Sequence, residues 1–307
     1  MMRIGVLDIG EINRRHSQVV ISDLLETAPI LEELGFSRFW LGEHHVNGVA
    51  WRSPVILISI LAGLTERMKI GAAGMQLLLH SPLRVAQDFK LLETIYSGRI
   101  DLGLARGLAS DLITTALLDS KNNESSKNGG YKVEYERKTA ELIAFLNASF
   151  DEAHPYNEIA IMPKISAAPD LWMLGTGRSS IPAAIKHKAN FCVSLFHSSD
   201  NNIDAIPEYK ELFVQAHGEP FKECSICISG VCSETTQKAK RIIKNHRNSA
   251  FVPTFWGNQA ECKEQILSLK EKHGVDEIIV FDLCQEFEDK LSSYKLISEA
   301  FNLPAFV

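Results

Sequence analysis

The runs Met68-Lys-Ile-Gly-Ala-Ala-Gly-Met-Gln-Leu77 and Arg99-Ile-Asp-Leu-Gly-Leu-Ala105 decide the fold, because each is typical of a short apolar strand and one helix lies between them. Pro82 stands where the first turn of a helix accepts proline, and the predicted helix continues to about Ser97. A strand, a helix and a second strand in succession indicate a sheet that is covered by helices.

The same alternation extends along the whole chain. Further strands are predicted at residues 3–8, 38–43, 170–177, 191–196, 224–231 and 277–281. Helices are predicted at residues 22–34, 53–65, 133–150, 179–189, 203–217, 235–249 and 260–272, and from the last strand to about residue 301. Ser22 is the expected N-cap of the first of these helices, and Gly35 its end.

Eight apolar strands, each followed by a helix, predict a (β/α)8 barrel rather than an open doubly wound sheet. No linker interrupts the alternation, so residues 1–307 are expected to form a single domain with loop insertions. The polar run 120–130 is expected to be a surface loop, and residues 158–165 a small excursion with a hairpin. In such barrels the chemistry lies on the loops at the carboxyl ends of the strands.

Composition excludes several classes of protein. The 307 residues are 45% hydrophobic and 23% charged, and the net charge of −6 argues against a nucleic-acid-binding protein. The longest nearly apolar run, residues 54–64, is too short to span a bilayer, and Asp8 interrupts the start where a signal peptide needs unbroken hydrophobicity. We therefore expect a cytoplasmic, soluble protein without membrane contact. The Cys224-Ser-Ile-Cys227 motif falls in a predicted strand and is interpreted as structural, not as a redox or zinc site.

Two of the predicted strand ends carry distinctive small or titratable residues. Glu43-His44-His45 follows the second strand, and adjacent side chains on an extended segment point to opposite sides. One histidine is therefore expected at the barrel mouth, for proton transfer or hydrogen bonding, and the other in the wall; two structural histidines are the alternative. The small residues around Ala73 and Gly74 either let a flat ligand approach the backbone or make a tight barrel corner.

Two further strand ends suit an anion. Arg106, after the fourth strand, could bind a phosphate, and Arg137 could add a second charge; surface salt bridges are the alternative for each. The turn that contains Thr176, Gly177, Ser179 and Ser180 offers hydroxyls and a helix N-terminus, although either serine could simply cap the helix. Neither metal-ligand spacing, a Ser-His-acid order, nor a GxGxxG motif occurs. The set suits a flat, phosphorylated cofactor that supplies the chemistry itself.

These residues resemble the bacterial luciferase-like flavin monooxygenases. The resemblance is carried by Leu34-Gly-Phe-Ser-Arg-Phe-Trp-Leu-Gly-Glu-His-His45, by Ser81-Pro-Leu-Arg-Val-Ala-Gln-Asp-Phe89 and by Ser97-Gly-Arg-Ile-Asp-Leu-Gly-Leu-Ala-Arg-Gly107. It is close over residues 1 to about 110. It continues more weakly through residues 171–177 and 293–301.

The resemblance implies an FMN-dependent monooxygenase that uses reduced FMN (FMNH2) and O2 to oxygenate a small organic substrate. His44 matches the family's acid/base histidine, with Glu43 and His45 assigned to the substrate pocket. The residues that it assigns to the cofactor are Ala73 and Gly74 at a non-proline cis peptide near the flavin ring, and Arg106, Arg137, Thr176, Gly177 and Ser180 around the phosphate. The pattern of the turn adds Ser179 to the cofactor-binding residues.

The chain departs from the luciferases at three places. Ala105 replaces a cysteine beside the flavin, Thr176 replaces a carboxylate, and the chain is shorter near residues 250–260. These departures favour an ordinary monooxygenase over a light-emitting enzyme. An F420-dependent oxidoreductase and a non-catalytic flavin-binding homologue are the alternatives. The family also implies a homodimer. Because the sequence contains no dinucleotide-binding motif, a separate flavin reductase is expected to supply the reduced cofactor.

Overall fold

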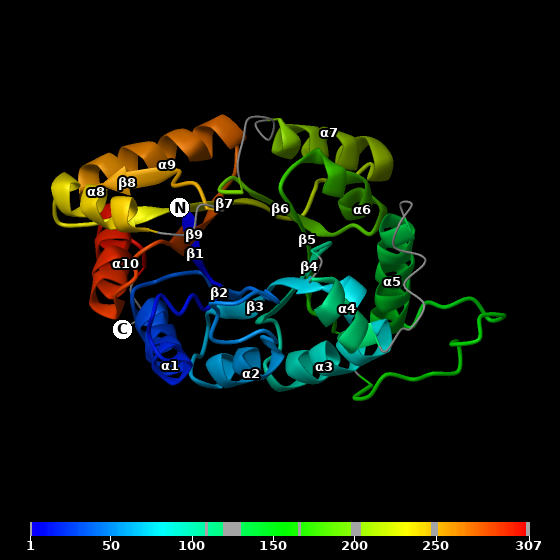
Figure 1. The fold of residues 1–307 in the computed structure, drawn as a ribbon. Helices are drawn as coiled ribbons and strands as arrows, with labels where there is room; N and C mark the ends of the chain where they lie inside the picture. The colour runs from blue at the N-terminus through cyan, green and yellow to red at the C-terminus, as the bar shows by residue number, and fades with distance from the viewer. Residues whose placement is uncertain are drawn as a thin grey trace.

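Eight parallel strands form a closed ring with helices around its outside (Figure 1). The computed structural model describes residues 2–107, 110–118, 130–164, 167–197, 204–246 and 251–304. The barrel strands are β1 (Arg3–Asp8), β2 (Arg38–Leu41), β3 (Lys69–Gln76), β4 (Ile100–Ala105), β5 (Asp170–Gly175), β6 (Asn190–Ser194), β7 (Cys224–Cys232) and β9 (Glu277–Asp282). Their order is β6-β5-β4-β3-β2-β1-β9-β7, and β6 pairs with β7 to close the ring. The predicted (β/α)8 barrel is confirmed.

The helices follow the strands in the expected alternation. They are α1 (Ser17–Glu33), α2 (Val55–Gly63), α3 (Pro82–Ile95), α4 (Asp111–Leu118), α5 (Gly130–Asn147), α6 (Ile181–Lys186), α7 (Ala205–His217), α8 (Thr236–Asn245), α9 (Gln259–His273) and α10 (Phe287–Phe301). Two short 3-10 turns, Leu77–Leu79 and Arg178–Ser180, precede α3 and α6. No helix in the described ranges is long and apolar enough to cross a membrane.

Several predicted boundaries are wrong. The first helix begins at Ser17, with His16 at its N-cap, because Val20 is buried one turn before Leu24 and extends the apolar face past Ser22. Helix α4 was not predicted, because its leucines do not form a buried stripe along one face: Leu112 is 82% exposed. The short strand β8 (Phe255–Gly257), which pairs with the end of β7, was also not predicted.

The segment between α5 and β5 projects away from the barrel (Figure 1). Its described residues, 148–164 and 167–169, form turns but no strand, so the predicted hairpin at 158–165 is not found there. The Met162–Pro163 peptide is cis, and proline cannot donate a hydrogen bond to a strand ladder. Most of the loop predicted at 120–130 lies outside the described residues, and α5 already begins at Gly130.

Successive strand residues face two different apolar layers. Phe39 and Leu41 pack between the sheet and the helices, whereas Trp40 packs inside the ring. Gly5 leaves room inside the ring, because a Cβ atom there would lie 2.4 Å from Cγ of Arg38. The interior of the barrel can therefore hold large side chains at this level.

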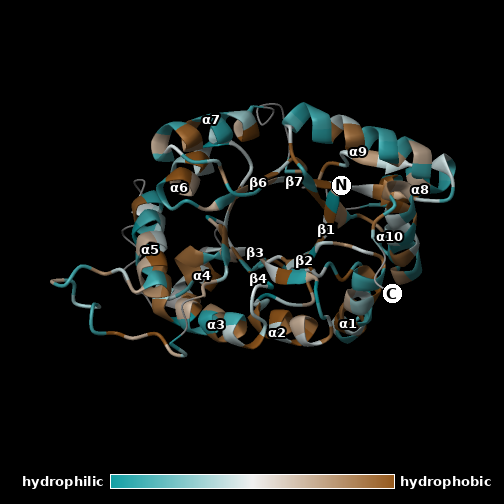
Figure 2. Cartoon of the chain, turned by 180° about the vertical axis from the view of Figure 1, so that it is seen from behind, coloured by the Kyte–Doolittle hydropathy of each residue, from teal (hydrophilic) through white to brown (hydrophobic). Residues whose placement is uncertain are grey.

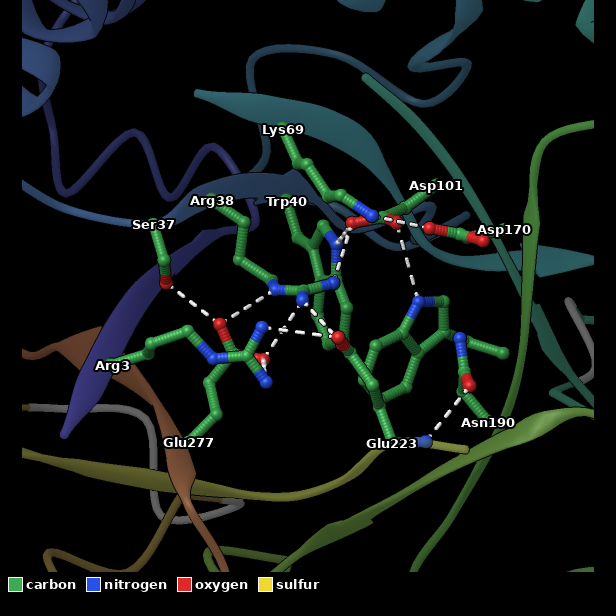
Figure 3. A network of polar contacts seen from close by, with 11 residues as sticks. Arg3, Ser37, Arg38, Trp40, Lys69, Asp101, Asp170, Asn190, Glu223 and Glu277 are labelled. Carbon is green, nitrogen blue, oxygen red and sulfur yellow. Dashed lines mark hydrogen bonds and ion pairs between the residues drawn. The ribbon is translucent and has the colours of Figure 1, made fainter. Parts of the chain in front are cut away.

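An ion-pair network occupies the barrel near the amino ends of the strands (Figure 3). The Arg38 guanidinium donates to Asp101 at 2.8 Å and to Glu277 and Glu223 at 2.9 Å, and only 1% of the Arg38 side chain is exposed. The surrounding carboxylates outweigh burial and raise the pKa of Arg38, so its charge is retained. The network closes this end of the barrel and leaves the opposite end for a cavity.

Candidate functional site

A cavity of about 320 Å³ opens at the carboxyl ends of the strands. This is the end at which (β/α)8 barrels carry their active sites, and the volume is in the range of small-molecule sites. The lining residues come from strand ends all around the ring: Leu7, Ile9, Trp40, Glu43, His44, Ala73, Gly74, Gln76, Ala105, Arg106, Gly107, Leu174, Gly175, Thr176, Ser180, Cys192, Ser194, Phe196, His197, Cys227 and Phe251.

The buried carboxylate of Glu43 organises the cavity wall after β2 and β3. Its Oε1 atom lies 2.7 Å from Nε2 of His45 and 2.7 Å from Nε2 of His80, and its Oε2 accepts the backbone N–H of Gln76 at 2.9 Å. Burial alone would raise the pKa of Glu43, but these hydrogen bonds from His80, His45 and Gln76 lower it below its ordinary value. Glu43 is thus an ionised structural hub of the wall.

The two adjacent histidines are separated as expected. His44 lines the cavity, whereas His45 is hydrogen-bonded to Glu43 and is not among the lining residues, so the structure does not place His45 in the substrate pocket to which it was assigned. Burial, reinforced by the nearby His45, lowers the pKa of His44 against the attraction of Glu43. The His44 imidazole is therefore neutral at pH 7 and can accept or release a proton. His80, which the sequence did not single out, completes the contacts of the Glu43 carboxylate.

A narrow floor lies beside this wall, on β3. The Ala73–Gly74 peptide is cis, as the resemblance implies, and both residues line the cavity. A Cβ atom on Gly74 would lie 2.7 Å from Cδ1 of Leu174 and 3.0 Å from the carbonyl oxygen of Gly103, so only glycine fits. Among the described residues, the buried Oε1 of Gln76 has no hydrogen-bond partner, although Nε2 of the same side chain donates to the Glu43 carbonyl at 3.0 Å. Gln76 lines the cavity, so this buried acceptor lies in the wall next to the flat floor.

Hydroxyls and one guanidinium converge at the ends of β4 and β5. Arg106 follows β4, and its Nη2 donates to Oγ of Ser179 in the turn after β5. Thr176 and Ser180 of the same turn line the cavity, and Oγ of Ser180 donates to the carbonyl of Leu174 at 3.3 Å. Gly177 and Ser179 lie in the turn but not among the lining residues.

The dipole contribution expected from the helix after this turn is small. Helix α6 has only six residues, and neither Ser179 nor Ser180 forms a side-chain cap. Anion affinity at this corner therefore depends on the guanidinium and the hydroxyl groups.

The structure does not bring Arg137 into the cavity. Its guanidinium lies on α5, where it pairs with Glu134 at 2.6 Å and with Glu141 one turn further along the helix. These two carboxylates raise the pKa of Arg137 despite partial burial. The i,i+3 and i,i+4 spacing makes these pairs local, so the salt-bridge alternative describes this residue. The expected pairing of Arg137 with Arg106 around one phosphate is not observed.

The other half of the cavity was not foreseen from the sequence. Ser194, Phe196 and His197 follow one another at and beyond the end of β6, and Phe251 comes from the segment between α8 and β8. The Oγ atom of Ser194 lies 2.7 Å from Nδ1 of His197. Because Ser194, Phe196 and His197 lie at or just after the end of a predicted strand, the barrel rule could have identified them, whereas no such rule indicates Phe251.

Trp40 connects the cavity to the ion-pair network (Figure 3). Its indole lines the cavity and packs edge-on against Trp172, with ring centroids 5.0 Å apart. The Cys192 and Cys227 thiols line the same interior, and burial raises the pKa of Cys192 to about 12. They are therefore protonated, unreactive thiols. No group of His, Cys, Asp and Glu with metal-binding geometry occurs in the described ranges.

Comparison with known proteins identifies relatives over nearly the full length. The model of the family described as luciferase-like monooxygenase matches residues 2–272. The chain is 27% identical to the luciferase-like monooxygenase of Escherichia coli (strain K12), over 91% of this chain and 82% of that protein.

Two solved structures share the fold. The apo-MsnO8 structure superposes with a TM-score of 0.85 at 24% identity, over 100% of both chains. The oxygenating constituent of 3,6-diketocamphane monooxygenase of Pseudomonas putida, solved in complex with FMN, gives a TM-score of 0.75 at 15% identity, over 97% of both chains.

Proposed function

The chain belongs to the luciferase-like monooxygenase family, and from this premise we propose that it is a monooxygenase that uses reduced FMN and O2 to oxygenate a small organic substrate. One observation carries the choice of cofactor. Arg106 reaches across from β4 to Ser179 in the turn after β5, which makes a cationic, hydroxyl-rich corner on an otherwise largely apolar cavity. A flat cofactor with one terminal phosphate matches that distribution of charge.

The phosphate corner fits a single anionic group. Arg106 is the only lysine or arginine among the described residues that line the cavity. It carries several N–H donors, and Ser179 engages one terminal nitrogen of the guanidinium. Thr176 would add a hydroxyl donor to the phosphate oxygens, and Ser180 could do so by giving up its 3.3 Å hydrogen bond to the Leu174 carbonyl. We assign phosphate binding to Arg106, Thr176, Ser179 and Ser180, with Gly177 shaping the turn.

The floor fits a planar ring that carries an N–H donor. Oε1 of Gln76 is buried and has no hydrogen-bond partner among the described residues, and such an acceptor is costly unless a ligand satisfies it. Ala73 and Gly74 present only small groups, so a ring can lie directly against the backbone. The isoalloxazine ring of FMN has a broad, nearly planar face and keeps its N3–H donor in both the oxidised and the reduced state, which supports its placement at this floor.

His44 is the residue to which we assign proton transfer. When bound, reduced FMN supplies the electrons for activation of O2, and the protein supplies binding, orientation and proton control. The neutral imidazole of His44 lines the cavity and can exchange a proton with a bound group. Glu43 and His45 hold the backbone of this strand end in place. The chain has no dinucleotide-binding motif, so we infer that a separate flavin reductase supplies the reduced cofactor.

We also infer that the protein is a homodimer. Helix α2 carries no charged residue, and its exposed side chains include Ile56, which is 73% exposed, and Ile60. Leu91 and Ile95 are exposed one turn apart on α3. A second copy related by two-fold symmetry would cover this surface with the same surface of its own. Light scattering of the wild type and of Ile60→Glu tests this inference. We expect the wild type to be a dimer and Ile60→Glu to be a monomer. A monomeric wild type would refute the homodimer.

An anaerobic titration tests the cofactor. The purified protein is titrated under nitrogen with reduced FMN, and in parallel with reduced F420, and each mixture is then exposed to O2 in a stopped-flow spectrometer. We expect saturable binding of reduced FMN and protein-dependent absorbance changes after O2. Preference for reduced F420 would support the oxidoreductase alternative. Binding of FMN without any change in its reaction with O2 would support the non-catalytic alternative.

A further inference from the structure

We propose that the part of the cavity formed by β6, β7 and β1 binds a neutral aromatic substrate through a single hydroxyl or carbonyl group, which His197 contacts and Ser194 helps to position. This inference rests on the proposed function, because it assigns a substrate class to the same cavity. It concerns a pair of residues that has no part in the assigned phosphate corner, the floor or the Glu43 wall.

The cavity has two chemically different halves. The charged and amide side chains, which are Glu43, Gln76 and Arg106, follow the neighbouring strands β2, β3 and β4. The remaining lining, around β1, β6 and β7, is mostly apolar: Leu7, Ile9, Cys192, Phe196, Cys227 and Phe251. Of these strands, β6 and β7 lie across the ring from β3 and β4 (Figure 2). The cofactor, assigned to the polar half, leaves this apolar half to the substrate.

The apolar half is built from aromatic rings. The Phe196 ring lies 5.5 Å from the Phe251 ring in an edge-to-face arrangement and 4.5 Å from the His197 imidazole. The imidazole also meets Phe251 edge-on at 5.5 Å. Aromatic rings attract further rings in such edge-to-face and offset arrangements, so a planar aromatic substrate fits this lining.

Ser194 and His197 are the polar pair in this half. The Ser194 hydroxyl is 2.7 Å from Nδ1 of His197, which leaves Nε2 as the imidazole's other polar atom. Within the described residues, Nε2 has no hydrogen-bond partner. The hydroxyl can donate to Nδ1 or accept from it, so the pair can present Nε2 either as a donor or as an acceptor. A carbonyl or a hydroxyl group on the substrate can therefore bind there.

The described part of this half offers no charged side chain that would pair with an ionic substrate. The described residues that line it include no lysine, arginine, aspartate or glutamate. Desolvation, together with the neighbouring His44, lowers the pKa of His197 to about 4, so its imidazole is neutral at pH 7. An anionic substrate would lose its hydration without gaining a partner of opposite charge.

Three probes of one shape test the proposal: 2-naphthol, naphthalene and 2-naphthoate. Their affinities are measured by fluorescence at pH 7 for the full-length protein, for His197→Phe, for Ser194→Ala and for His187→Phe as a control outside the cavity. We expect wild type to bind 2-naphthol roughly two- to tenfold more tightly than naphthalene, the effect of about one hydrogen bond, and 2-naphthoate most weakly. His197→Phe should keep the affinity for naphthalene and lose the preference for 2-naphthol over naphthalene. Ser194→Ala should reduce that preference, and His187→Phe should retain it.

The outcomes separate this inference from the proposed function. Preference for 2-naphthoate, or discrimination that survives in both His197→Phe and Ser194→Ala, would overturn the inference. If His197→Phe does not fold, His197→Gln takes its place, and its amide should preserve the preference that Ser194→Ala weakens. FMN affinity is measured on the same samples. FMN binding without discrimination between the probes overturns only the inference, whereas discrimination without FMN binding overturns only the proposed cofactor.

Discussion

Trp40 donates its indole N–H to Oδ2 of Asp101 over 2.7 Å, and the same indole forms part of the cavity lining. Asp101 also accepts from Arg38 at 2.8 Å and from Trp172 at 3.3 Å. The carboxylate is completely buried, and burial raises its pKa against the attraction of Arg38. The indole N–H of Trp40 is thus hydrogen-bonded to the ion-pair network, while the same ring system lines the ligand cavity. The network therefore holds one wall of the cavity in position.

Arg38→Met should destabilise the protein strongly. The substitution leaves Asp101, Glu277 and Glu223 around a missing charge, and removing one partner of a buried ion pair costs about 3–5 kcal/mol. Urea denaturation followed by tryptophan fluorescence measures the free energy of unfolding. The control is Arg3→Met, which removes a half-exposed member of the same network and should cost less than about 1 kcal/mol.

The loss of stability in Arg38→Met should depend on pH. Without Arg38 the pKa of Asp101 in the folded protein rises further, so the folded state binds a proton more tightly than the unfolded state. A carboxyl with a raised folded pKa favours folding at low pH and opposes it as pH rises through that pKa. The stability difference from wild type should therefore shrink between pH 8 and pH 5. A difference that grows on acidification would contradict this account of the network.

The barrel could be predicted from sequence because its strands are short and largely apolar and helices alternate with them. β7 and β9 are buried at every position, which is typical of parallel strands covered on both faces. Boundaries failed where tertiary contacts decide them, as at Val20 in α1. β8 is only three residues long and depends on its pairing with Gly230–Cys232 of β7, which no local pattern reveals.

The site could be predicted only in part for a related reason. His44 and Arg106 stand in recognisable motifs at strand ends, and both line the cavity. His197 and Phe251 are 54 positions apart in the chain, and their proximity depends on how separate segments return to the barrel mouth. Arg137 shows the opposite error, because helical neighbours at positions 134 and 141 satisfy its charge locally.

Glu43→Gln should lower the stability of the protein without changing the shape of the cavity wall around residue 43. An amide cannot accept from His45, His80 and the Gln76 backbone N–H at once, and a buried donor left unpaired costs about 1–3 kcal/mol. Because the folded pKa of Glu43 is lowered, this stabilisation is present above the ordinary pKa near 4.5 and is lost as pH falls through the lowered value. Thermal unfolding between pH 8 and pH 4 measures it, with the exposed Glu33→Gln as control. Equal stability of the two variants at pH 7 would contradict the role of Glu43 as a hub.

Arg106→Ala should weaken FMN binding far more than riboflavin binding. A charge-assisted contact with a phosphate contributes about 1.5–3 kcal/mol, which corresponds to a ten- to hundredfold change in affinity. Fluorescence quenching of either flavin on binding gives both affinities. Arg178→Ala is the matched control, because Arg178 lies in the same turn but pairs with Asp204 and Glu208 and does not line the cavity. Equal losses for both flavins would show that Arg106 supports the fold instead of the phosphate.

His44→Ala should separate O2 consumption from oxygenation of the substrate. The His44 side chain lines the cavity, so its removal should leave the fold and FMN affinity near wild type. Loss of general acid–base assistance typically reduces turnover by about 10²- to 10⁴-fold, while unproductive release of hydrogen peroxide continues. Because burial lowers the pKa of His44, wild-type turnover that depends on the neutral imidazole should persist as pH falls to 6.5 and decline only below it.

His45→Ala should instead lower the melting temperature, since it removes the 2.7 Å contact with the buried Glu43 carboxylate. The measurements are 18O incorporated from 18O2 into the organic product and hydrogen peroxide formed, each per flavin oxidised, together with thermal unfolding. Wild-type coupling in His44→Ala with lost coupling in His45→Ala would reverse the assignment of the two histidines, and unchanged coupling in both would make the pair structural.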